Sequence, residues 1–127
     1  MHITNQFNII RLYTDKDGIS HFQQVSPHDM NTNILESVPG LLFSPMMHAT
    51  GFILETFSAD FFIDWHTPPD GKRYAGIFVE GSMCFEASDG EKRIVSAGDV
   101  LFYEDTTGQG HRTYGVTAGK EVIIVLP

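Results

Sequence analysis

The stretch that decides the fold runs from Trp65 to His111 and reads WHTPPDGKRYAGIFVEGSMCFEASDGEKRIVSAGDVLFYEDTTGQGH. Short apolar or alternating runs are separated in it by the turn signals Glu80-Gly81, Asp89-Gly90 and Ala97-Gly98-Asp99. Asp-Gly and similar pairs supply the positive backbone angle φ that tight hairpin turns need. The stretch therefore predicts four short strands between tight turns, with one histidine at each end.

The same pattern continues on both sides of this stretch. Runs rich in β-formers predict ten short strands, at residues 7–13, 19–25, 50–57, 61–65, 74–79, 82–88, 91–95, 100–103, 111–114 and 122–126. Residues 26–40 are expected to form a surface connection. The apolar residues 41–47 are expected to pack into the core through their methionines, or else to form an edge strand or a lid. Evenly spaced short strands predict an all-β sandwich or barrel. We expect one domain over residues 1–127, with N-terminal strands and a connection in 1–49 and the barrel core in 50–127.

The composition excludes several classes of partner. Sixteen acidic and eight basic residues give a formal charge of −8, which argues against nucleic-acid and anionic membrane surfaces. The N-terminus lacks the basic start and apolar run of a signal peptide, and no apolar stretch reaches the roughly 20 residues of a membrane helix. Cys84 is the single cysteine, so no intrachain disulfide forms. We therefore expect a cytoplasmic protein with no nucleic-acid or membrane partner.

From Tyr74 onward, the sequence YAGIFVEGSMCFEASDGEKRIVSAGDVLFYEDTTGQGHRTYG resembles the cupin superfamily, and the resemblance extends over roughly residues 61–125. Gly81 matches the final glycine of the first cupin motif, while Gly98 and His111 match the glycine and the histidine of the second. The resemblance implies a small, RmlC-like jelly-roll barrel, also called a double-stranded β-helix.

The sequence departs from the metal-binding pattern of this family. Tyr74 stands at the position of the family's glutamate, and Glu104 at the position of a proline in the second motif. The two histidine positions of the first motif fall near residues 68–70, which hold no histidine, and His66 is the nearest one. The family's three histidines and one glutamate are thus represented by His111 and His66 alone.

Two interpretations of His66 and His111 stay open. In the first, they hold one divalent Fe, Mn, Ni or Zn ion together with Glu104 or Asp105, because two histidines and a carboxylate suit such ions. In the second, no metal binds, and the histidines hydrogen-bond in a polar pocket or act as acid and base, because histidine titrates near neutral pH. Glu104 and Asp105 are neighbours along a strand, so at most one of them faces the pocket.

Three further residues are candidates for contacts with a ligand. Arg73 would pair with a substrate carboxylate, Tyr74 would donate a hydrogen bond, and Trp65 would stack on the ligand. The structural alternatives are a solvated loop end, an ordinary strand aromatic and a core tryptophan.

The predicted function is that of a small cupin-fold protein that binds a small polar organic molecule in the barrel. It would act as an isomerase, a lyase or a metal-dependent oxygenase, and the alternative is a non-catalytic module that binds or senses a metabolite. The apolar hairpin at residues 7–25 predicts a homodimer.

Overall fold

The computed structural model describes residues 6–26, 33–34 and 42–127. The strands are β1 (Asn8–Thr14), β2 (Ser20–Val25), β3 (Asn33–Ile34), β4 (Leu42–Phe43), β5 (Gly51–Phe57), β6 (Phe62–His66), β7 (Tyr74–Ala87), β8 (Lys92–Ser96), β9 (Asp99–Glu104) and β10 (His111–Val125). The helical element within these ranges is the 3-10 turn η2 (Pro69–Gly71), and no helix there is long and apolar enough to span a membrane. The all-β class predicted from the sequence is confirmed.

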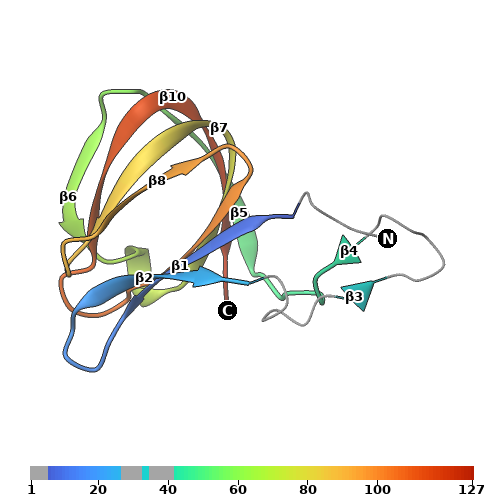
Figure 1. Ribbon diagram of the computed structural model, residues 1–127, viewed down its shortest axis with the longest axis horizontal. Coiled ribbons are helices and arrows are strands. Elements are labelled where there is room, and N and C mark those ends of the chain that lie inside the picture. Colours follow the sequence, from blue (N-terminus) through green and yellow to red (C-terminus); the bar gives the residue numbers. More distant parts are fainter. Residues whose placement is uncertain (1–5, 27–32, 35–41) are drawn as a thin grey trace.

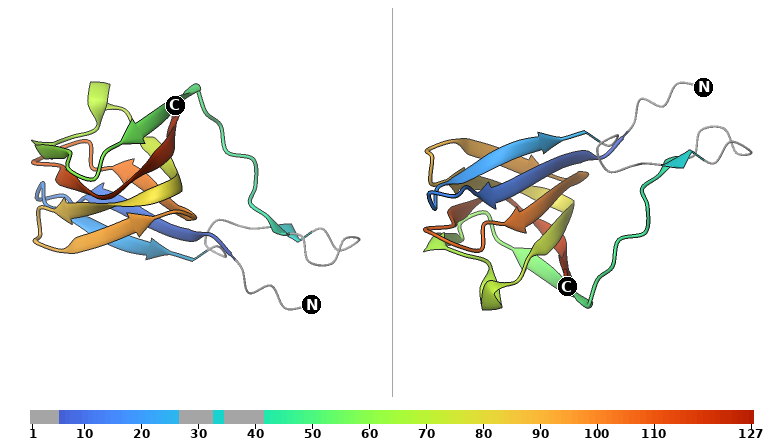
Figure 2. Two further views of the ribbon diagram at one scale, coloured as in Figure 1. Left: turned by 90° about the horizontal axis from the view of Figure 1, so that it is seen from above. Right: turned by 90° about the horizontal axis from the view of Figure 1, so that it is seen from below.

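Eight of the strands form one curled sheet (Figure 1). Their order is β2-β1-β9-β7-β10-β5, with β6 paired to β10 and β8 paired to β7. β1 runs parallel to β9, and the other pairings in the sheet are antiparallel. The curl places β1 and β2 on the opposite side of the molecule from β5 (Figure 2). Alternate residues of the strands therefore point into a common interior, as they do in a barrel.

Two strands are longer than the sequence predicted. β7 and β10 continue through Glu80-Gly81 and through residues 117–120, where turns were expected. The two strands bend together there, and their pairing passes through three register shifts between Gly115 and Glu121. Gly81 has a φ of 75°, and a Cβ on it would lie 2.3 Å from the carbonyl oxygen of Ala118. The glycine therefore allows a bulged bend inside a continuous strand, and the neighbouring strand supplies the hydrogen bonds.

The core fills the interior of the curled sheet. The most deeply buried apolar side chains come from β1, β7, β8 and β9 and are Leu12, Phe78, Phe85, Val95 and Leu101. Burying a large apolar side chain contributes roughly 1.5–3 kcal/mol. The core therefore ties the N-terminal strands to the rest of the barrel.

The β1–β2 hairpin is part of this core. Ile10, Leu12 and Phe22 pack against the other buried residues, and β1 pairs with β9 from Asn8 to Tyr13. The apolar face that suggested a homodimer is thus buried within the chain itself. This face is therefore not available to a second copy of the chain.

The prediction of core packing by the methionines of residues 41–47 is wrong. Met46 is 86% exposed and Met47 is 52% exposed. This part of the chain leads from β4 to β5 outside the barrel (Figure 1), so its side chains have no apolar surface to pack on. Leu41, and the connection expected over residues 26–40 apart from Ser26 and β3, lie outside the described residues.

Candidate active site

β6 ends and β10 begins with a histidine, and these two histidines meet. His66 and His111 are partners in the antiparallel pairing of the two strands, and their ring centroids lie 4.4 Å apart. Gly110 permits this approach, because a Cβ there would lie 2.0 Å from the carbonyl oxygen of His66. The fold therefore places two imidazoles side by side where the strands begin and end.

Asp105 holds one of the two rings. Its Oδ2 lies 2.5 Å from Nδ1 of His111, and the exposed fractions of Asp105 and His111 are 0% and 2%. Because a carboxylate only accepts, Nδ1 of His111 carries the proton, and Nε2 keeps its lone pair when the ring is neutral. The other carboxylate oxygen, Oδ1, is buried without a hydrogen-bond partner. A buried carboxylate that orients an imidazole in this way prepares the ring to act as a general base.

His66 is oriented by its own strand. Its Nδ1 donates to the carbonyl oxygen of Asp64 over 2.7 Å, so Nε2 of this ring also keeps its lone pair. Burial lowers the pKa of His66 below its ordinary value of 6.5, and the proximity of His111 adds to this effect. His66 is therefore neutral at pH 7, and it is the more exposed of the two rings.

Aromatic rings enclose His111 on the inner side. The rings of Phe85 and Tyr103 lie 5.7 and 5.8 Å from the His111 ring, and they contact each other edge to face. These rings keep water away from the Asp105–His111 hydrogen bond. A low local dielectric strengthens the electrostatic interaction between the two residues.

Glu104 is the last residue of β9, and it is engaged on the other side of the chain from Asp105, which follows it. Its carboxylate accepts hydrogen bonds from Arg11 and from Nη1 of Arg73, the latter over 2.6 Å. Burial acts to raise the pKa of Glu104, but the two guanidinium groups together hold it below its ordinary value. Glu104 and Arg73 are thus engaged with each other and are not brought to His66 or His111.

The donors at this site do not fit the divalent metal considered from the sequence. In the described part of the chain, no group of three or more His, Cys, Asp or Glu side chains is placed to hold a metal ion. His66 and His111 offer two nitrogen lone pairs, whereas protein metal sites generally use three or four protein ligands. Of the two carboxylates considered as the third ligand, Glu104 is held by arginines, and Asp105 is hydrogen-bonded to Nδ1 of His111.

Tyr74 and Trp65 make contacts of other kinds. Tyr74 is buried, and its hydroxyl donates to the carbonyl oxygen of Pro69 over 2.9 Å, which fastens the loop around η2. Trp65 carries the guanidinium of Arg112 at 4.9 Å from its ring centre. Of the predicted site residues, the structure therefore groups His66, His111 and Asp105.

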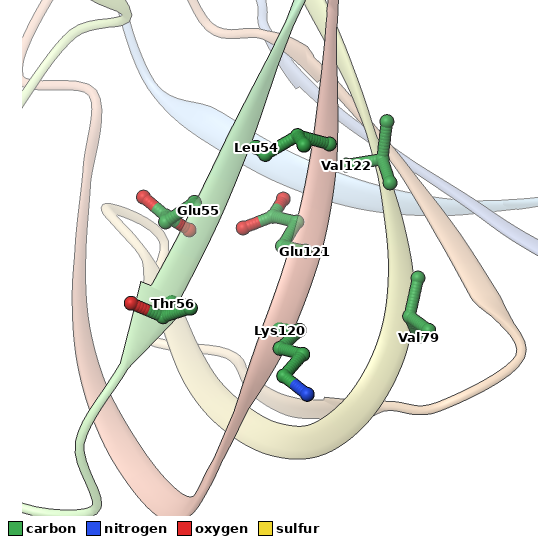
Figure 3. A pocket seen from close by; sticks show the side chains of 7 residues that line it. All are labelled: Leu54, Glu55, Thr56, Val79, Lys120, Glu121 and Val122. Atoms are coloured by element: carbon green, nitrogen blue, oxygen red, sulfur yellow. The ribbon is translucent and has the colours of Figure 1, made fainter.

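A second polar group of the interior was missed in the sequence. The hydroxyl of Tyr103 donates to Oε2 of Glu121 over 2.7 Å, and Glu121 is the cross-strand partner of Glu55 (Figure 3). Each glutamate stands beside or within an apolar run, GFILETF for Glu55 and EVIIV for Glu121. An acid at an inward position of an apolar strand is a usable signal, because burying a charge without a partner is costly.

No protein-family model and no curated protein matches the chain. Among solved structures, the chain is similar to an RmlC-like cupin protein from Desulfovibrio desulfuricans, with 14% identity, 100% of this chain and 89% of that chain covered, and a TM-score of 0.48. It is similar to the EutQ protein of Clostridium difficile, with 15% identity, coverage of 91% and 93%, and a TM-score of 0.49. It is also similar to a predicted oxalate decarboxylase from Thermotoga maritima, with 15% identity, coverage of 99% and 98%, and a TM-score of 0.48. These identities are too low to bring a substrate or an activity to this chain.

The fold is visible in the structure itself. Gly81 lies inside β7, Gly98 in the turn before β9 and a buried His111 at the start of β10. The curled sheet of eight strands gives the chain an all-β fold of the jelly-roll type.

Proposed function

We propose that the protein binds a small polar organic molecule beside His66 and His111 and moves a proton to or from it, as isomerases and lyases do. The observation that carries this proposal is the buried hydrogen bond between Asp105 and His111, with the neutral ring of His66 packed against it. Positioned general acids and bases typically contribute about 10²–10⁴-fold to a reaction rate.

In this proposal His111 is the base. Asp105 keeps the proton of the ring on Nδ1, so the lone pair of Nε2 takes a proton from the bound molecule. The carboxylate of Asp105 then stabilises the imidazolium that results. His66 is neutral and more exposed, so it hydrogen-bonds the bound molecule and exchanges protons with solvent.

The test is a ligand screen followed through the histidine ring signals by NMR. We expect a ligand to shift the ring signals of His66 and His111 and to raise the melting temperature, and we expect His111→Asn to abolish both effects. His21→Asn is the matched control, because His21 bonds Asp15 and Asp89 in surface turns. Ligands that stabilise the protein and leave both ring signals unchanged would contradict the proposed site.

A non-catalytic binding module is the second candidate. The burial of His111, which is 2% exposed, favours it, because a catalytic base has to reach its substrate. Binding without turnover distinguishes this function from the first.

We further propose a cytoplasmic homodimer. Cys84 is a free, buried thiol, which accords with a reducing compartment. Phe52 and Leu54 on β5 are 69% and 74% exposed and supply apolar surface for a second copy. A monomer by light scattering at every concentration up to the millimolar range would contradict the dimer.

A further inference from the structure

The interior of the barrel holds buried acidic side chains and no buried Lys or Arg side chain, as all eight of these residues are described. Asp105 and Glu121 are 0% and 2% exposed. The arginines beside the barrel are paired to other carboxylates, as Arg112 is to Glu86. The negative charge of the interior is therefore not neutralised by any cationic side chain of the chain.

Glu121 and Glu55 form the larger part of this acidic interior. They are direct partners in the antiparallel pairing of β10 with β5, a relation that brings Cβ atoms to about 4.5–5.5 Å. Figure 3 shows Glu55 on β5 and Glu121 on the neighbouring β10. The pair borders a hollow of about 290 Å³ whose other lining residues are Leu54, Thr56, Val79, Lys120 and Val122. Lys120 is exposed and pairs with Glu80.

Two neighbouring residues fix the position of the Glu121 carboxyl group. The hydroxyl of Tyr103 donates to its Oε2, and a Cβ on Gly76 would lie 1.9 Å from that same oxygen. Any residue larger than glycine at position 76 would therefore displace the carboxyl group.

The surroundings of Glu121 favour its protonated form. Burial, and then the hydrogen bond with Glu55, raise the pKa of Glu121 to about 9. Glu121 therefore keeps its proton at neutral pH.

Hydrogen-bond acceptors are also in excess in the interior. Oδ1 of Asp105 is buried without a partner. The tautomers of His66 and His111 leave two further lone pairs, one on each Nε2. Buried polar atoms in folded proteins are nearly always paired, so these acceptors call for a molecule that donates.

We propose that the ligand of this barrel carries a protonated amine, which donates to Oδ1 of Asp105 in an interior that also holds the acidic side chains Glu55 and Glu121. An ammonium group has three donors and no acceptor, which matches a site with unpaired acceptors and uncompensated negative charge. This inference rests on the proposed function, because it names the ligand class of the same site. It also replaces the organic acid that Arg73 was expected to bind, since Arg73 pairs with Glu104.

The experiment compares three probes of one shape and different charge: n-butylamine, 1-butanol and butyrate. Each is titrated into the protein at pH 7 while the ring signals of His66 and His111 are followed by NMR. We expect the butylammonium ion to bind at least about tenfold more tightly than butyrate, with butanol between them. Asp105→Asn should remove this preference, and Glu104→Gln, which changes an acid engaged on the other side of the chain, should retain it.

The outcomes separate the two proposals. Tighter binding of butyrate, or a preference for the ammonium ion that survives Asp105→Asn, would overturn the amine ligand and leave the site in place. If none of the three probes perturbs either histidine, the ligand class and the proposed binding function both fail.

Discussion

Oδ2 of Asp105 lies 2.5 Å from Nδ1 of His111 in a part of the barrel that is closed to solvent. This hydrogen bond fixes the plane and the tautomer of the ring, and the aromatic side chains of Phe85 and Tyr103 keep water away from it. Burying an ionised carboxylate costs several kcal/mol, and the bond to His111 offsets only part of that cost because Oδ1 of Asp105 has no partner.

Gly110→Ala should separate the two histidines. The added Cβ would meet the carbonyl oxygen of His66 at 2.0 Å, and the φ of 74° at this position disfavours any side chain. We expect a loss of stability of about 3 kcal/mol in urea denaturation and a changed ring signal for His66.

Gly98→Ala is the matched control for this substitution. The φ of Gly98 is 93°, and a Cβ there would meet nothing within 4 Å. The variant should therefore lose only the stability that corresponds to backbone strain, about 1 kcal/mol. Equal losses in the two variants would show that the close approach of His66 and Gly110 is absent.

His66 should make the fold less stable in acid. Its pKa is lowered by burial, so its contribution to the free energy of unfolding is present above pH 6.5 and is lost as the pH falls through the lower, folded-state pKa. His66→Gln should flatten this part of the pH profile, measured by urea denaturation between pH 5 and 8.

In the same experiment, His21 should change the free energy of unfolding with pH in the opposite direction. Its hydrogen bond to Asp15, and then that to Asp89, raise its pKa, so its contribution is present below pH 6.5 and is lost as the pH rises through the raised pKa. If His66→Gln and His21→Gln changed the profile in the same direction, the buried, neutral state of His66 would be wrong.

Glu121→Gln should stabilise the protein in alkali. The raised pKa means that the stability Glu121 contributes is complete below pH 4.5 and is lost progressively as the pH rises to about 9. A glutamine keeps the shape and accepts from Tyr103, so we expect a gain of about 2 kcal/mol at pH 8 and little change at pH 4.5.

Glu80→Gln serves as the control for Glu121. The Glu80 side chain is 60% exposed and pairs with Lys120 at the surface, so its loss should change stability by less than about 1 kcal/mol at each pH. A Glu121→Gln variant that is equally destabilised at pH 4.5 and pH 8 would contradict the raised pKa of Glu121.

Loading with Fe(II), Mn(II), Ni(II) or Zn(II) should leave no metal bound in a one-to-one ratio after dialysis. His66 and His111 provide two donors, and Glu104 is held by Arg11 and Arg73. Elemental analysis of the wild type, His66→Ala and His111→Ala measures this. One metal ion per chain that both variants lose would establish a metal site at these histidines and would contradict the prediction.

Much of the fold was predictable because local signals dominate it. Turn residues and the alternation of apolar and polar residues located the strands. The prediction failed where a glycine is compatible both with a turn and with a bend inside a continuous strand. Gly81 and the residues around Gly119 look like turns in the sequence, but β7 and β10 bend together there and stay paired. Whether such a segment forms a turn or a bent strand depends on its pairing with a neighbouring strand, and no local sequence pattern describes that pairing.

The site was predictable in part for the same reason. His66 and His111 stand at strand ends, and the Glu104-Asp105 pair was visible as two acids of which one faces inward. The partner of Glu104 is Arg11, which lies 93 residues away in the sequence, so its engagement was out of reach. The pair of Glu55 and Glu121 was missed because the register shifts in β10 hide which of its residues face the interior.

The measurement that tests the central claim most directly is solvent hydrogen exchange into bound ligands. Ligands that shift the ring signals of His66 and His111 are incubated in D2O with the wild type, Asp105→Asn and His111→Asn, and the loss of their C–H signals is followed by NMR. We predict exchange with the wild type and a rate at least about 10²-fold lower with each variant. Binding with no exchange, or exchange at the same rate in all three proteins, would contradict a proton-transfer function for Asp105 and His111.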